Sequence, residues 1–260
     1  MDPVDRSSSS RPWKRALLGA LVLGTLVPVF FLRPIPQPPK YHRFADQRAL
    51  FGLPHFLDVA SNFPFLVARL LGLCTALTKP GASLVDPAAR APWVVLMGSI
   101  FLTGFGSSYY HWAPEDATLF WDRLPMALGF SALLGIVLLE RVDRTWGRRL
   151  WLPILVAGLG SLLYWRFRGD LRWYVLLQAW AVLLVPAILL LFESPTTETR
   201  LLGISLGLYA AAKVLELLDV KIFEALGGLV SGHTLKHLAA GLASWFIVLH
   251  LKRRQPVPRP

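Results

Sequence analysis

Residues 105–122, which read FGSSYYHWAPEDATLFWD, lie between two long apolar runs and place three chemically active side chains there. These are Ser107, His111 and Asp122. Each of them costs free energy in hydrocarbon unless it finds a partner, so polar residues in such a place suggest a function. Ser107 and His111 are four residues apart, and both side chains therefore project from one face of a helix.

A second polar stretch, SGHTLKHLAAG at residues 231–241, opens the last apolar run with two histidines four residues apart. His233 and His237 share a helix face and have a spacing that suits two ligands of one metal ion. Together with His111 they describe a three-histidine zinc site with an open fourth position for water. Asp122 could then accept and return a proton, and Ser107 could hydrogen-bond the water or a developing oxyanion. From spacing alone, a set of interfacial polar residues remains an equal alternative.

The composition indicates a membrane protein, because 54% of the 260 residues are hydrophobic, only 17% are charged and the mean hydropathy is +0.50. Soluble domains carry about 25% charged residues. A membrane-spanning helix needs roughly 20 apolar residues. We therefore expect an all-α, polytopic membrane protein with eight spans, at 16–32, 56–78, 93–112, 119–139, 150–165, 171–192, 201–218 and 233–250.

The formal net charge of +11 is concentrated at the ends of the spans, at 11–15, 141–149 and 252–254. This distribution is typical of positive-inside topology and does not indicate a nucleic-acid partner. It places the N-terminus, the 140–149 loop and the C-terminus on the inner side. We interpret the first span as an uncleaved anchor rather than a signal peptide, because no small-residue cleavage pattern follows it.

Alternation of the spans brings the rare polar groups to one membrane face from helices that are distant in sequence. The third and fourth spans meet at that face, and the second and eighth spans begin there. The residues expected at this level are Asp58, Ser61, Asn62, Ser107, His111, Asp122, His233 and His237.

The stretch GSSYYHWAPEDATLFWDRLPM, taken with the later SGHTLKH, resembles the alkaline ceramidase family, which belongs to a wider superfamily of membrane hydrolases. The family pattern is a serine four residues before a histidine, an aspartate eleven residues after it, and an HxxxH pair in the last membrane helix. Residues 41–65, YHRFADQRALFGLPHFLDVASNFPF, also resemble the corresponding segment of bacterial members. The resemblance covers roughly residues 41–251.

The resemblance implies a seven-helix transmembrane hydrolase domain at 41–251. It is preceded by a region at 1–40, with a cytoplasmic tail, an additional N-terminal transmembrane helix and a proline-rich connector, and followed by a basic tail at 252–260. It implies zinc held by His111, His233 and His237, with Ser107 and Asp122 as catalytic residues. It also implies hydrolysis of the amide bond of ceramide-like lipids to a long-chain base and a fatty acid. A dedicated calcium site is not expected, because six or more oxygen ligands are needed and this N-terminal segment is largely basic.

Two further functions stay open for this architecture. One is a lipid-sensing receptor, and the other is an ester-cleaving, lipid-remodelling hydrolase. The short tails favour an enzyme, and no protein partner is predicted. If the source is bacterial, the expected location is the inner membrane.

Other polar residues are expected to have structural roles. We interpret Lys213 and Glu216 as a neutralising pair on one helix face, with Asp219 as a possible support for the site. His42, His55 and His250 lack a matching partner in the sequence and are expected to be interfacial.

Overall fold

A computed structural model describes residues 12–78, 84 and 86–257, and this part of the chain is predominantly helical and contains no strand. Two predicted regions lie outside the described residues. They are the N-terminal tail at 1–11, with its basic residue Arg11, and the end of the basic C-terminal tail, at 258–260. The α-helices are α1 (Pro12–Phe31), α2 (Phe56–Ala60), α3 (Phe63–Thr78), α4 (Arg90–Trp112), α5 (Asp116–Val137), α6 (Arg144–Arg168), α7 (Arg172–Leu191), α8 (Thr199–Leu217), α9 (Asp219–Ala225) and α10 (Gly232–Arg253). Short turns of other helix types occur at Pro39–His42, Pro87–Ala89 and Leu138–Val142.

Seven helical segments in the described part are long and apolar enough to cross a membrane, which supports a multi-pass membrane protein. The seventh predicted span, at 201–218, corresponds to α8, which carries Arg200, Lys213 and Glu216. It reaches the required length and apolarity only together with α9, across a bend of 77°. The predicted span at 56–78 is helical as well, but α2 and α3 are separate helices that meet at Ser61 and Asn62.

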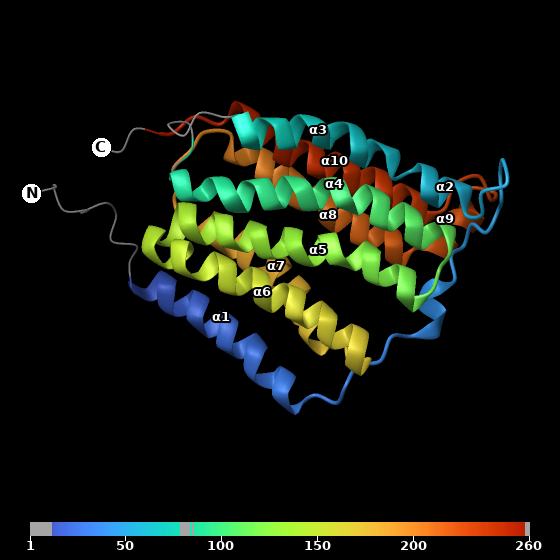
Figure 1. The fold of residues 1–260 in the computed structure, drawn as a ribbon, viewed down its shortest axis with the longest axis horizontal. Coiled ribbons are helices and arrows are strands. Elements are labelled where there is room, and N and C mark those ends of the chain that lie inside the picture. The colour runs from blue at the N-terminus through green and yellow to red at the C-terminus, as the bar shows by residue number, and fades with distance from the viewer. Residues whose placement is uncertain (1–11, 79–83, 85, 258–260) are drawn as a thin grey trace, which may run out of the picture.

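The long helices run side by side along the longest axis of the molecule, and α2 and α9 lie together at one end (Figure 1). The start of α1, the junction between α5 and α6, and the end of α10 lie at the opposite end. An ion pair of 3.2 Å between Arg15 and Asp143 joins α1 to that junction. The regions predicted to share the inner side are therefore at one end of the bundle.

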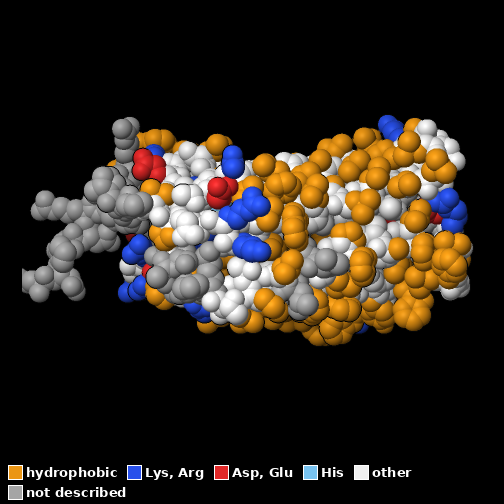
Figure 2. Space-filling view, turned by 90° about the horizontal axis from the view of Figure 1, so that it is seen from above, with side chains coloured by type: hydrophobic (Ala, Val, Ile, Leu, Met, Phe, Trp, Pro, Cys, Tyr) orange, Lys and Arg blue, Asp and Glu red, His pale blue; other side chains and the backbone are white. Residues whose placement is uncertain are grey.

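The surface follows the same division (Figure 2). Hydrophobic side chains cover most of the visible face along the bundle, whereas lysine, arginine and acidic side chains gather toward its ends. A lipid bilayer accepts apolar side chains in its hydrocarbon region and charged ones at its surfaces. The long axis of the bundle is therefore the expected direction of the membrane normal.

Hydrogen bonds with side chains cap the N-terminal ends of α5 and α10, the helices that carry Asp122, His233 and His237. At the start of α5, the backbone N–H of Glu115 donates to the hydroxyl of Thr118 at 3.2 Å. At the start of α10, the hydroxyl of Ser231 accepts from the backbone N–H of Thr234 at 3.0 Å. Such N-terminal caps satisfy N–H groups that have no partner inside the helix. These caps fix where α5 and α10 begin, and therefore where Asp122 lies along α5 and where His233 and His237 lie along α10.

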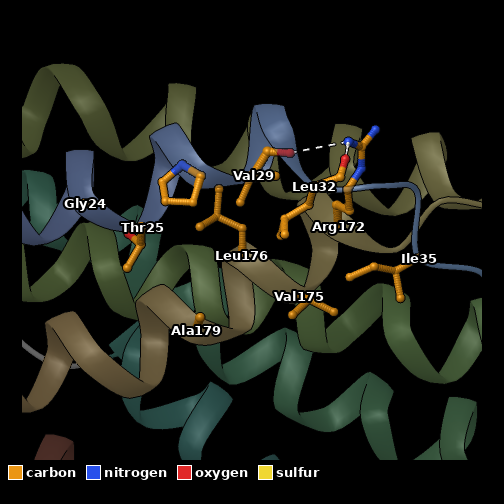
Figure 3. A pocket seen from close by; sticks show the side chains of 10 residues that line it. Gly24, Thr25, Val29, Leu32, Ile35, Arg172, Val175, Leu176 and Ala179 are labelled. Carbon is orange, nitrogen blue, oxygen red and sulfur yellow. Dashed lines mark hydrogen bonds between the residues drawn. The ribbon is translucent and has the colours of Figure 1, made fainter.

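A cavity of about 250 Å³ lies between α1 and α7 and is almost entirely apolar (Figure 3). Arg172 stands at one end of it and donates to the carbonyl oxygen of Val29 at 3.3 Å. The guanidinium of Arg172 also pairs with Asp170 at 2.8 Å. None of the residues that line this cavity belongs to the polar cluster predicted from the sequence.

Candidate metal centre

The structure brings together three histidines from opposite parts of the chain. His111 lies in the last turn of α4, whereas His233 and His237 lie in the first turns of α10. One nitrogen of each imidazole lies within 4.8 Å of the others, and all three side chains are buried. The predicted convergence of these residues at one end of the bundle is confirmed, and the group could hold a metal ion.

The distance between the nitrogens of His111 and His233 fits two ligands of one small metal ion. The Nε2 atoms of His111 and His233 are 3.3 Å apart. Two nitrogens that bind zinc tetrahedrally, each at about 2.0–2.1 Å, are separated by roughly 3.3–3.4 Å. Ring centroids of the three imidazoles are 4.8, 4.8 and 4.9 Å apart, so no pair is favoured over the others. The three rings thus already have the spacing of a shared ligand set.

The ring of His237 is oriented by Ser61, which caps the C-terminal end of α2. The Nδ1 atom of His237 lies 2.8 Å from the hydroxyl of Ser61, which donates to the backbone oxygen of Asp58 at 3.1 Å. Because that hydroxyl proton is used on Asp58, the Nδ1–H of His237 donates to Ser61, and the Nε2 lone pair stays available for a metal. Hydrogen bonds of this kind from outer groups fix the tautomer and direction of metal-binding histidines.

The carboxylate of Asp58 is itself held by α10. Its Oδ1 atom accepts from the hydroxyl of Thr234 at 2.6 Å, and the hydroxyl of Ser231 lies 3.4 Å away. Asp58 thus ties α2 to the first turn of α10, between the two histidines of that helix. The expectation that Asp58 and Ser61 lie at the level of the histidines is confirmed.

The segment before α2 covers the histidines. The ring of Phe44 lies 4.6 Å from that of His111 and 4.7 Å from that of His233, centroid to centroid. Asp219, expected as a support, accepts from the backbone N–H of His233 at 2.7 Å and from that of Ala45 at 3.0 Å. It therefore joins α9 and the covering segment to the start of α10.

An ion pair between Asp46 and Arg48 fixes the backbone of this covering segment just after Phe44. Arg48 binds both carboxylate oxygens of Asp46, at 2.8 and 2.6 Å. Burial raises the pKa of Asp46, but the hydrogen bonds and charge of Arg48 outweigh it, so the pKa lies below its ordinary value. A depressed pKa means that this stabilisation is present at neutral pH and is lost as the pH falls through the folded-state value.

Ser107 and Asp122 meet next to the histidines through a close approach of α4 and α5. The two side chains share a hydrogen bond, with Ser107 buried and Asp122 half-buried. The approach is possible because Gly106 has no side chain. A Cβ atom at this position would lie 2.2 Å from the backbone oxygen of Trp121. The helices, and with them the serine and the aspartate, are held together by a backbone contact.

We expect Gly106→Ala to push α4 and α5 apart and to separate Ser107 from Asp122. The obstacle is backbone rather than a movable side chain, so relief requires a shift of a whole helix. The expected result is a loss of about 1–3 kcal/mol of stability, the usual cost of overpacking. Gly98→Ala is the matched control on the same helix, since a Cβ there meets nothing within 4 Å. Thermal unfolding of both variants in detergent checks this, and equal midpoints for the two would contradict it.

Lys213 and Glu216 form the predicted ion pair on α8, at 2.6 Å. The sequence reasoning missed the third member of this group. Lys236 of α10 lies 3.0 Å from the other carboxylate oxygen of Glu216 and 2.9 Å from Nε2 of His233. The sequence did contain a signal for this contact. Lys236 is a charged residue inside a predicted span, between two histidines, and such a residue needs a partner of opposite charge.

The three remaining histidines differ in their surroundings. His42 bonds Tyr110 at 3.0 Å and Asp116 at 3.1 Å, and His55 precedes α2 in a left-handed conformation. His250 lies in the last turn of α10 and is buried, because α10 packs against α8 and the carbonyl of Glu198 accepts from its Nδ1 at 3.1 Å.

No family model matches this chain, and no curated protein sequence matches it.

Proposed function

We propose that this chain is a zinc-dependent, integral-membrane lipid amidase that cleaves the amide bond of ceramide-like lipids. The observation that carries the proposal is the group of three buried histidines from α4 and α10, next to the hydrogen-bonded pair of Ser107 and Asp122. This combination of three imidazoles, a carboxylate and a hydroxyl is the residue set predicted from the resemblance to alkaline ceramidases.

The donor set fits zinc. Three neutral imidazoles with an open fourth position are a common arrangement of catalytic zinc sites. When bound, zinc supplies a Lewis acid that polarises a carbonyl and lowers the pKa of water to about 7. His111, His233 and His237 are the residues that would hold it, with Ser61 fixing the direction of His237.

Asp122 is the group that moves the proton in the proposed reaction. Hydrolysis of an amide adds water across the C–N bond, so one proton must pass from the attacking water to the departing nitrogen. The carboxylate of Asp122 accepts that proton and gives it to the amine, which leaves as the long-chain base while the acyl group leaves as the fatty acid. Ser107 donates its single hydroxyl hydrogen to the carboxylate and keeps it in place. Once Asp122 holds the proton, this hydroxyl hydrogen is free to donate to oxygen at the reacting carbonyl.

The position of the histidines along the bundle suits a lipid amide. His111 is the next-to-last residue of α4, and His233 is the second residue of α10. The site therefore lies near one end of the spans, at the depth where the amide of a membrane lipid sits below its head group. An acyl chain can stay in hydrocarbon while the amide reaches the site.

We further propose that α2 through α10 form a seven-span catalytic core, with α8 and α9 as a bent span, and that α1 is an addition. The support is that α1 packs against α7 and contributes none of the polar residues around the histidines. Figure 1 shows α1 at the outer edge of the bundle. In this proposal the core begins with the segment before α2, in which Phe44 covers the histidines.

The proposal is tested by metal analysis followed by turnover of labelled ceramide by the purified chain, with and without a strong chelator. The expected result is stoichiometric zinc and release of fatty acid that the chelator abolishes and added zinc restores. Zinc without product from any amide lipid would favour a lipid sensor. Product from a diacyl ester lipid alone would favour an ester-cleaving hydrolase.

A further inference from the structure

Lys236 is a charged group at the candidate metal centre that the proposed reaction does not yet use. Its ammonium nitrogen lies 2.9 Å from Nε2 of His233, the atom that also lies 3.3 Å from Nε2 of His111. The ammonium of Lys236 therefore lies on the side of the His233 imidazole that would bind the metal. A carboxylate oxygen of Glu216, at 3.0 Å, holds it there.

The hydrogen-bonding capacity of Lys236 is not met by Glu216 alone. An ammonium group has three donors. Glu216 also serves Lys213, whose nitrogen lies 2.6 Å from its second oxygen, so one carboxylate is shared between two cations. If a metal takes the lone pair of His233, Lys236 loses its contact with that nitrogen. Donors of Lys236 then face the open side of the site and need an acceptor.

Arg123, next to Asp122 on α5, is a second cation with an unmet donor. Its side chain is buried, and its Nη1 atom has no hydrogen-bond partner among the described residues. Its guanidinium carbon lies 5.2, 4.5 and 5.3 Å from the ring centroids of Tyr41, Trp165 and Tyr174. Aromatic faces stabilise the charge of a guanidinium, but the N–H groups in its plane still require oxygen acceptors.

Lys236 and Arg123 act on a common region. Both are close enough to the carboxylate of Asp122 to interact with its charge, and Arg123 is the next residue along α5. Buried donors without acceptors cost free energy, and an anion satisfies the charge and the hydrogen bonds of both groups at once.

We propose that Lys236, with Arg123, binds an acidic group of the lipid, so that the preferred substrates are amide lipids that carry a negative charge near the scissile bond. This inference rests on the proposed amidase function and narrows its substrate class. The acidic group can be a carboxylate beside the amide, as in an N-acyl amino acid, or a phosphate on the head group of a ceramide. Both offer the same chemistry to an ammonium and a guanidinium.

Two matched pairs of lipids test the inference with the purified full-length chain in detergent. N-palmitoylglycine is compared with N-palmitoylglycinamide, and ceramide 1-phosphate with ceramide. We expect the acidic member of at least one pair to have a kcat/KM about ten- to a hundredfold higher than its neutral partner, the usual range for charge-assisted hydrogen bonds. The pair that shows the preference identifies the carboxylate or the phosphate as the recognised group.

Three variants assign the preference to Lys236. Lys236→Met removes the charge at similar length and is expected to bring the ratio close to one, mainly through a higher KM for the acidic lipid. Lys236→Arg is expected to retain part of the preference. Lys221→Met, on the exposed side of α9, is the matched control and is expected to leave the ratio unchanged.

Binding to the metal-free protein gives a readout independent of turnover. Dissociation constants of the same four lipids, measured by tryptophan fluorescence, are expected to show the acidic preference in the unaltered chain and to lose it in Lys236→Met. Equal constants within both pairs, or a preference that Lys236→Met leaves intact, would overturn the inference. If the four lipids are cleaved without regard to charge, the amidase function stands and the inference fails. If none is cleaved, the amidase proposal fails and the binding constants still decide the role of Lys236.

Discussion

His237→Ala is expected to abolish both zinc binding and amide hydrolysis. His237 supplies one of three donor nitrogens, and α2 holds its ring through Ser61 so that Nε2 faces His111 and His233. Two histidines alone leave too few ligands for a tightly held ion. Loss of an outer-shell partner costs about 10–100-fold in metal affinity or activity, and loss of a ligand itself is expected to exceed this. Zinc content measured by mass spectrometry, beside ceramide turnover, checks both effects.

The matched control for this variant is His250→Ala, which changes a buried histidine near the opposite end of the same helix. It is expected to keep zinc and turnover, because His250 bonds the carbonyl of Glu198 and is not part of the histidine group. Stoichiometric zinc in His237→Ala would contradict the assignment of His237 as a ligand. Loss of zinc in both variants would point to a general defect in folding.

Asp122→Asn is expected to keep the metal and to lower turnover by about 10²–10⁴-fold, the usual contribution of a positioned acid or base. The amide has nearly the shape of the carboxylate, so it can still bond Ser107, but it cannot accept the proton of water at neutral pH. Asp122 is not among the grouped metal-binding side chains, and the zinc content should therefore stay near that of the unaltered chain. Single-turnover kinetics with labelled ceramide, together with zinc analysis, measure the two quantities.

Asp116→Asn is the control for charge on the same helix. Asp116 is in the first turn of α5, is exposed, and bonds His42 at 3.1 Å. It should lose little turnover, since exposed ion pairs contribute about 0–1 kcal/mol. Unchanged turnover in Asp122→Asn would give Asp122 a purely structural role and remove the proton carrier from the proposed reaction.

The convergence of the histidines could be predicted because a membrane restricts the fold. Each apolar run must cross the bilayer, so His111 at the end of one span and His233 at the start of another fall on the same side by alternation alone. The four-residue spacing then sets His237 beside His233 on the helix face. These rules act on whole helices, and they need no knowledge of packing.

Other parts of the site depend on packing that the pattern of spans does not contain. Phe44 and Asp46 lie in a segment with no regular period, so their contacts with His111 and Arg48 could not be read from the sequence. The contact of Lys236 with Glu216 depends on how α8 and α10 rotate against each other. The separation of α2 from α3 likewise reflects local contacts, because Ser61 bonds His237 where the helix is interrupted.

X-ray absorption at the zinc edge of the purified chain tests the three-histidine zinc site itself, because it reports the atoms around the metal without an assay of activity. We expect zinc bound by three imidazole nitrogens at about 2.0–2.1 Å with an oxygen in the remaining position. This signal should vanish in His237→Ala. Zinc with sulfur among its ligands, or a chain purified with zinc present that binds none, would contradict the account.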